Sequence, residues 1–144
     1  MSIPAPGVSV EAQNFNWLVS RFAQHTAGAI AAIAVSADGL LIAVSSELER
    51  SNADRLAAIS SAMLGLAHGV SESHPLGSPD KVIIELEHGY LLVCTISIGC
   101  SLGVLANKQA SLGTIAYEMA MFANRATEVL TPGLIEELKN SVGS

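Results

Sequence analysis

The spacing of apolar positions along the chain predicts helices and strands in a mixed order. Apolar residues at every third or fourth position predict helices over residues 11–25, 51–71 and 110–130. A short final helix should follow Thr131-Pro132, because threonine caps helices and proline suits their first turn. Short apolar runs bounded by turn residues predict strands over 29–36, 40–45, 81–87, 90–98 and 101–106. Up to the third long helix, the predicted order is α-β-β-α-β-β-β-α.

Tight turns between these strands predict an antiparallel sheet. Asp38-Gly39, His88-Gly89 and Ile98-Gly99 each separate two apolar runs, as in hairpins. The strand over 81–87 carries charges on one face, which favours an edge position. The last two strands are apolar on both faces and should lie centrally, covered on each side. The predicted fold is an α+β sandwich, with one helix on one face of the sheet and two on the other.

The helix over 51–71 has an unusual surface. Ser51 and Asp54 have the spacing of a capping box at its start. A bulky stripe is expected to face the protein's own core: Leu56, Ile59, Met63, Leu66 and Val70. The other side carries only small residues: Ala58, Ser61, Ala62, Gly65 and Gly69.

No Asp, Glu, Lys or Arg occurs between Leu56 and Ser71. Small side chains let a second backbone approach closely, so this helix is predicted to be covered twice, by its own core and by a partner. The alternative is a helix buried within a monomer.

Composition and charge agree with a protein that binds other proteins. Of the 144 residues, 50% are hydrophobic and 14% charged, and the net charge is −6. The negative charge argues against partners such as nucleic acid or an anionic membrane surface. We expect a single domain over residues 10–141 after a flexible tail over residues 1–9. Residues 1–9 lack the basic and apolar runs of an export signal, so a cytoplasmic location without membrane insertion is expected.

Residues for catalysis or metal binding are not arranged in a familiar pattern. The four histidines and two cysteines lack metal-ligand spacing, and no phosphate-binding glycine loop or nucleophile elbow occurs. Glu85 and Glu87 share a strand face, but solvated acids are the common case there. Cys94 and Cys100 lie in an apolar run and should be buried, unreactive thiols. We therefore expect no catalytic residue, cofactor or metal site, and a protein that is not an enzyme.

Several segments, in order, resemble the roadblock family (dynein light-chain roadblock type). They are Asn16-Trp17-Leu18, residues 35–43 (VSADGLLIA), residues 53–59 (ADRLAAI), residues 89–93 (GYLLV), Tyr117-Glu118-Met119 and Leu130-Thr131-Pro132. The likeness runs from Phe15 to Leu138 and is greatest to an actinobacterial branch encoded with a sensor kinase and a small GTPase. Thr26-Ala27-Gly28 departs from the family, where a Pro-Gly pair is expected before the first strand.

The resemblance implies a five-stranded roadblock fold and a homodimer joined through the second helix and the third strand. The strand positions at that interface would be Val82, Ile83, Ile84 and Glu85. It also implies a small Ras-like GTPase as partner, and some relatives stimulate hydrolysis by remodelling the GTPase without supplying an arginine. The docking positions would lie among Ala58, Ser61, Ala62 and Gly65.

Three functions remain open at this point. The protein would be a GTPase regulator, a dimeric scaffold for a sensor kinase and other signalling proteins without effect on hydrolysis, or, ranked lowest, a small-molecule sensor. Arg50 and Arg55 are the local candidates for an arginine finger, although a solvated or ion-paired arginine is the common case.

Overall fold

The computed structural model describes residues 8–45 and 47–143, and the predicted order of elements is confirmed within them. Residues 1–7 of the expected tail lie outside the described residues. The elements are α1 (Val10–His25), β1 (Ala29–Ser36), β2 (Leu41–Val44), α2 (Arg50–Ser73), β3 (Lys81–Leu86), β4 (Gly89–Ser97), β5 (Cys100–Asn107), α3 (Leu112–Thr127) and α4 (Pro132–Gly143). Most bounds fall within two residues of the prediction.

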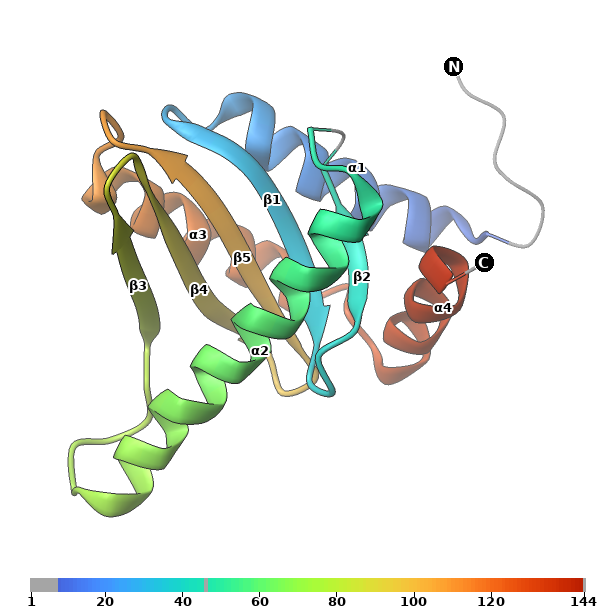
Figure 1. Cartoon of the computed structure of the whole chain (residues 1–144). Helices are drawn as coiled ribbons and strands as arrows, with labels where there is room; N and C mark the ends of the chain where they lie inside the picture. The colour runs from blue at the N-terminus through green and yellow to red at the C-terminus, as the bar shows by residue number, and fades with distance from the viewer. Residues whose placement is uncertain (1–7, 46, 144) are drawn as a thin grey trace.

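The five strands form one antiparallel sheet in the order β2-β1-β5-β4-β3. The expected edge position of β3 and the interior positions of β4 and β5 are therefore confirmed. Gly39, in the turn between β1 and β2, has a φ of +83°, which explains why glycine follows Asp38 there. β4 and β5 are apolar on both faces because helices cover the sheet on each side (Figure 1).

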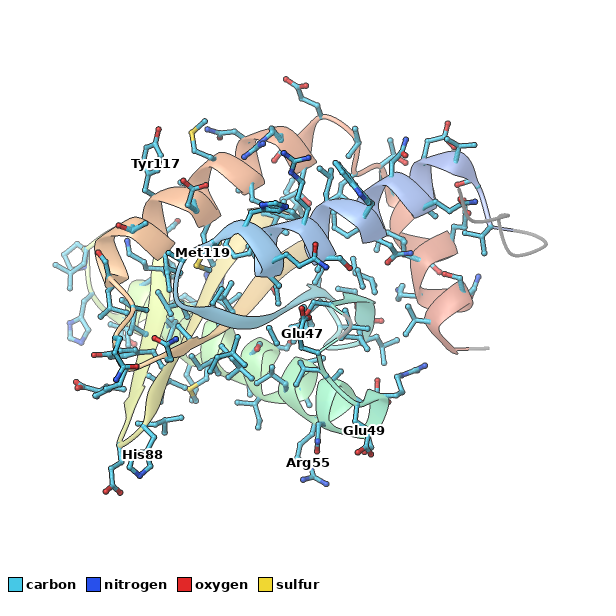
Figure 2. The ribbon with its side chains drawn as sticks, turned by 90° about the horizontal axis from the view of Figure 1, so that it is seen from above. Glu47, Glu49, Arg55, His88, Tyr117 and Met119 are labelled. Carbon is cyan, nitrogen blue, oxygen red and sulfur yellow. The ribbon has the colours of Figure 1, made fainter. Side chains whose placement is uncertain are left out.

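Two helices cover one face of the sheet, and α2 crosses the other (Figures 1 and 2). The larger core lies under α1 and α3, where the Phe122 ring meets Phe15 and Phe22 at centroid distances of 6.2 and 5.7 Å. α4 packs against β2 and adds Leu134 and Leu138 to this core. One sheet edge is thereby covered by a helix, whereas β3 forms the other edge.

The predicted inward stripe of α2 is wrong. The residues that α2 buries are small, apart from one leucine: Ala53, Ala57, Ser60 and Leu64. Ile59, Leu66 and Val70 are 42%, 66% and 55% exposed, and Leu56 and Met63 are half-buried. The helix is therefore rotated so that the stripe Ala53, Ala57, Ser60 and Leu64 meets the sheet, while most of the predicted small side faces outward.

A close approach between α2 and β5 explains this rotation. Gly103 lies on β5 under α2, and a Cβ atom there would lie 3.0 Å from the Ser60 hydroxyl oxygen. Only small side chains fit between a helix and a sheet at such short range. The carboxyl-terminal end of α2 extends past the sheet (Figure 1), where no strand is present to cover its bulky residues.

The predicted capping box at the start of α2 is also wrong. Glu49 is the N-cap residue, and its side chain makes no capping hydrogen bond. The Ser51 hydroxyl donates to the Glu49 carboxylate at 2.6 Å, and Asp54 instead pairs with Arg50 at 3.0 Å. Arg50 also donates a hydrogen bond to the main-chain carbonyl of Val142, and this hydrogen bond links the start of α2 to α4.

Replacing Gly103 with alanine should lower the free energy of unfolding by about 1–3 kcal/mol, as overpacking does in a tight core. The new methyl group would push against Ser60 and against Ile33 at 3.2 Å. Urea denaturation measures the change. Gly65→Ala is the matched control: nothing lies within 4 Å of its added Cβ, and alanine favours a helix. Equal stability of the two variants would contradict the close approach of α2 to the sheet.

Candidate functional site

From Leu56 to Ser71, the outward side of α2 is an apolar surface without acidic residues, lysine or arginine. We define the α2 face as the exposed residues Ala58, Ile59, Ala62, Gly65, Leu66, Gly69 and Val70. It lies within the segment Leu56 to Ser71, which holds no acidic residue, lysine or arginine. Exposed apolar patches of this kind mark surfaces that bind other proteins.

The structure places four of the five predicted small residues of α2 on this face. Ala58, Ala62, Gly65 and Gly69 are exposed, whereas Ser61 is half-buried beside Gly39. An added Cβ at Gly65 or Gly69 would find nothing within 4 Å, so both positions are open. A neighbouring backbone could therefore approach α2 closely along this line.

The sequence reasoning missed the bulky part of the site. Ile59, Leu66 and Val70 were assigned to the core but lie among the small residues of the α2 face. A signal for the true orientation was present, since Ala53, Ala57, Ser60 and Leu64 also recur at helical spacing. Hydrophobicity alone favoured the bulkier stripe.

β3 continues this surface at the open edge of the sheet. Val82 and Ile84 are half-buried and pack with Leu64 of α2 against β4, so they lie on the α2 side. Ile83 is 41% exposed and projects to the opposite side. In the part of the chain that the structure describes, no strand pairs with the outer edge of β3. Unpaired edges of this kind present backbone hydrogen-bonding groups to a second chain.

The charged groups near this surface are mostly paired. Glu85 on β3 accepts a hydrogen bond from Lys108 at 2.6 Å, and that lysine also lies 4.5 Å from the Tyr90 ring centre. Glu87 lies 3.7 Å from His88, so Glu85 and Glu87 have different partners and do not form an acid–base pair. Arg55 points outward from α2 (Figure 2) and forms no ion pair with any described residue.

The two thiols are protonated near neutral pH. Desolvation raises the pKa of Cys94 to about 11 and that of Cys100 to about 12. Both cysteines are free, Cys94 half-buried and Cys100 buried. A neutral thiol is a poor nucleophile and metal ligand, so these groups act as small apolar core residues.

The described ranges hold neither a metal-binding cluster nor a helix that could span a membrane. Within residues 8–45 and 47–143, no cluster of three or more His, Cys, Asp or Glu could hold a metal ion. None of the described helices combines the length and the apolar character needed to span a bilayer.

Comparison with known proteins identifies the family. The Roadblock/LC7 domain profile matches residues 15–106. The chain belongs to the Roadblock/LC7 family. The matched range contains α2 and β3, and therefore the whole candidate site. No curated protein sequence matches the chain.

Solved structures show the same roadblock fold. A Roadblock/LC7 domain from Streptomyces avermitilis is 31% identical, with a TM-score of 0.74 over 78% of this chain and 94% of that one. MglB from Myxococcus xanthus is 16% identical, with a TM-score of 0.73 over 81% and 94%. An MglB in a tetrameric arrangement is 14% identical, with a TM-score of 0.75 over 88% and 96%. At these lower identities, the likeness to MglB concerns the fold.

The buried thiols should make the protein less stable in alkali. Because folding raises both thiol pKa values above the ordinary value of 9.0, the unfolded chain loses these protons first as the pH rises. The free energy of unfolding should therefore be maintained below about pH 9 and fall between about pH 9 and 12.

Urea denaturation at pH 8 and pH 10 checks this for the wild-type protein and for Cys100→Ala. The alanine variant should lose less stability between the two pH values, since it has one buried thiol fewer. An identical loss in both proteins would show that Cys100 does not titrate differently in the folded and unfolded states.

Proposed function

We propose that this roadblock protein is a non-enzymatic, homodimeric regulator or adaptor of a small Ras-like GTPase, acting in the cytoplasm. The observation that carries the proposal is the charge-free α2 face beside the open edge of β3. The α2 face exposes apolar side chains to water. The β3 edge exposes backbone N–H and C=O groups that a strand of another chain could pair.

Burial of the α2 face is the driving force in this proposal. Ile59, Leu66 and Val70 would leave water on association, and each buried aliphatic side chain of this size is worth roughly 1.5–3 kcal/mol before the costs of association. Gly65 and Gly69 would let a partner helix or loop approach the backbone. The absence of charge from Leu56 to Ser71 removes the usual desolvation penalty.

The β3 edge supports self-association in particular. Two copies related by a two-fold axis could pair their β3 strands antiparallel and form one continuous sheet. Val82 and Ile84 would then meet their counterparts beside α2, while Ile83 and Glu85 would meet theirs on the opposite side. An MglB of similar fold has a tetrameric arrangement, which supports this part of the proposal.

GTPase regulation is proposed from the family resemblance, and the contacts of Arg50 favour a mode that uses no arginine finger. Arg50 is held by Asp54 and by the carbonyl of Val142, so it is not free to enter another active site. Regulation would then act by binding and reshaping the loops of the GTPase. Arg55 would serve at most as a surface contact.

The alternative function is a pure scaffold. In that case the same dimer would hold a GTPase, a sensor kinase or another signalling protein without changing nucleotide hydrolysis. The apolar character of the α2 face favours binding in both cases. Phosphate release by the cognate Ras-like GTPase, with and without this protein, distinguishes them: retained binding with unchanged hydrolysis selects the scaffold.

Gly65→Arg should abolish self-association or GTPase binding without unfolding the protomer. The position is open, and arginine is a better helix former than glycine, so the melting temperature of the protomer should not fall. A long cation would hold a partner surface away from α2. Light scattering measures the mass in solution, and a pull-down with the GTPase measures binding.

A control for this change is Gly113→Arg, an exposed glycine in the first turn of α3 on the other side of the sheet. That variant should keep the wild-type mass and the wild-type GTPase binding. If Gly65→Arg also keeps both, the α2 face is neither the dimer interface nor the GTPase surface, and the proposal fails.

Arg55→Ala should leave any stimulation of GTP hydrolysis within about twofold of the wild type. A true arginine finger contributes roughly a thousandfold or more to hydrolysis. Single-turnover phosphate release at saturating concentrations of this protein is the measurement. A loss of stimulation near that size, with binding retained, would make Arg55 a catalytic finger and overturn the mechanism proposed here.

A further inference from the structure

A second surface of interest lies on the opposite side of the sheet from α2. We define the α1/α3 face as Trp17, Arg21 and His25 of α1 with Tyr117, Met121 and Arg125 of α3. Trp17 is 57% exposed and Tyr117 is 62% exposed. Figure 2 shows Tyr117 pointing away from the sheet, while Met119 of the same helix points toward it. Exposed Trp, Tyr, Met and Arg are the residue types enriched where proteins bind one another.

A hollow of about 200 Å³ lies between α1 and α3 within this face. Apolar parts of Leu18, Phe22 and Phe122 contribute to its lining. The basic side chains Arg21, His25 and Arg125 line it as well, together with one acid, Glu118. The hollow thus combines an apolar lining with an excess of basic groups.

The arginines of this hollow are available for an outside anion. The chain has seven lysines and arginines and a net charge of −6. Arg50, Lys81, Lys108 and Lys139 each pair with an acid of the protein. Among the described residues, Arg21, Arg55 and Arg125 form no ion pair.

Both of the arginines at the hollow are nevertheless held in place. The Arg21 guanidinium lies 5.0 Å from the centre of the Trp17 ring, a cation–π contact that leaves its hydrogen-bond donors free. The Nε of Arg125 donates to the carbonyl of Met121 at 3.4 Å, which leaves its terminal nitrogens available. Both groups are therefore suited to bidentate contacts with carboxylates.

We propose that the α1/α3 face docks an acidic amphipathic segment of a partner protein. Carboxylates of that segment would pair with Arg21 and Arg125 at the hollow, and its apolar side would cover Trp17 and Met121. Charge complementarity selects an acidic partner, because these are unpaired cations on an otherwise acidic protein.

This surface is independent of the proposed GTPase and dimer site. The sheet separates the α1/α3 face from α2 (Figures 1 and 2), so both surfaces could be occupied at once. The protein would then bridge two partners, one on each side of its sheet.

Trp17 is the single tryptophan of the chain, so its fluorescence reports on this face alone. The probe is a tryptophan-free amphipathic peptide with leucine at every third or fourth position and glutamate elsewhere. Titration into the full-length protein at low salt should shift the Trp17 emission to shorter wavelength, and added salt should weaken binding. A matched peptide with lysine in place of glutamate should not bind.

Paired charge reversals locate the site. Arg21→Glu combined with Arg125→Glu should weaken binding by about tenfold or more, since two attractive contacts become repulsive. Arg55→Glu reverses the third unpaired arginine, on α2, and should bind the peptide like the wild type. Circular dichroism and thermal unfolding verify that each variant folds. If the double charge reversal does not fold, the neutral double variant Arg21→Gln with Arg125→Gln replaces it in the binding experiment.

Three outcomes would overturn the proposal. The first is an emission spectrum that stays unchanged up to about millimolar peptide. The second is a loss of binding in the Arg55→Glu variant as large as that in the double variant. The third is binding of the lysine peptide as tight as that of the glutamate peptide. An emission shift that depends on the concentration of the protein alone would assign this face to self-association instead. Gly65→Arg should still bind the peptide, so failure of this proposal and failure of the proposed function are distinguishable.

Discussion

The close contact between α2 and β5 is the constraint on which the candidate site depends. Gly103 leaves no Cβ under the helix where Ser60 lies, and Ala53 and Ala57 pack against residues of β1 and β2. A helix seated this near a sheet turns a stripe of mostly small residues inward, because bulky side chains would not fit. The bulky residues of α2 are thereby placed on its outer surface, where they form an apolar face with the remaining alanines and glycines.

The two sides of the sheet have different physical characters. On one side, α2 is free of charge over four turns, extends past the sheet and lies beside the open β3 edge. On the other, α1 and α3 present exposed aromatic residues and unpaired arginines around a hollow. α4 covers the β2 edge, which leaves β3 as the edge suited to pairing. An adaptor needs such separate, chemically distinct surfaces, and the sheet keeps them apart.

Local patterns predicted most of the fold correctly because the responsible interactions are close in sequence. Asp38-Gly39 predicted a hairpin, and a positive φ at Gly39 is present there. The stripe Ile115, Met119 and Phe122 of α3 is buried, since hydrophobicity and burial agree in that helix. In the candidate site, the small residues Ala58, Ala62, Gly65 and Gly69 are predicted on the side away from the protomer's own core and lie there. Their role in binding stays a prediction.

The sequence by itself determined the order of elements, the antiparallel sheet, the edge position of β3 and the family. Only the tertiary structure decided which side of α2 faces inward, because that depends on the distance to Gly103, some forty residues away in the chain. It also decided the partner of Asp54, which is Arg50 rather than the Ser51 backbone, and the grouping of Arg21 with Arg125. Helical spacing reveals that two stripes exist, but the available space between layers determines which one is buried.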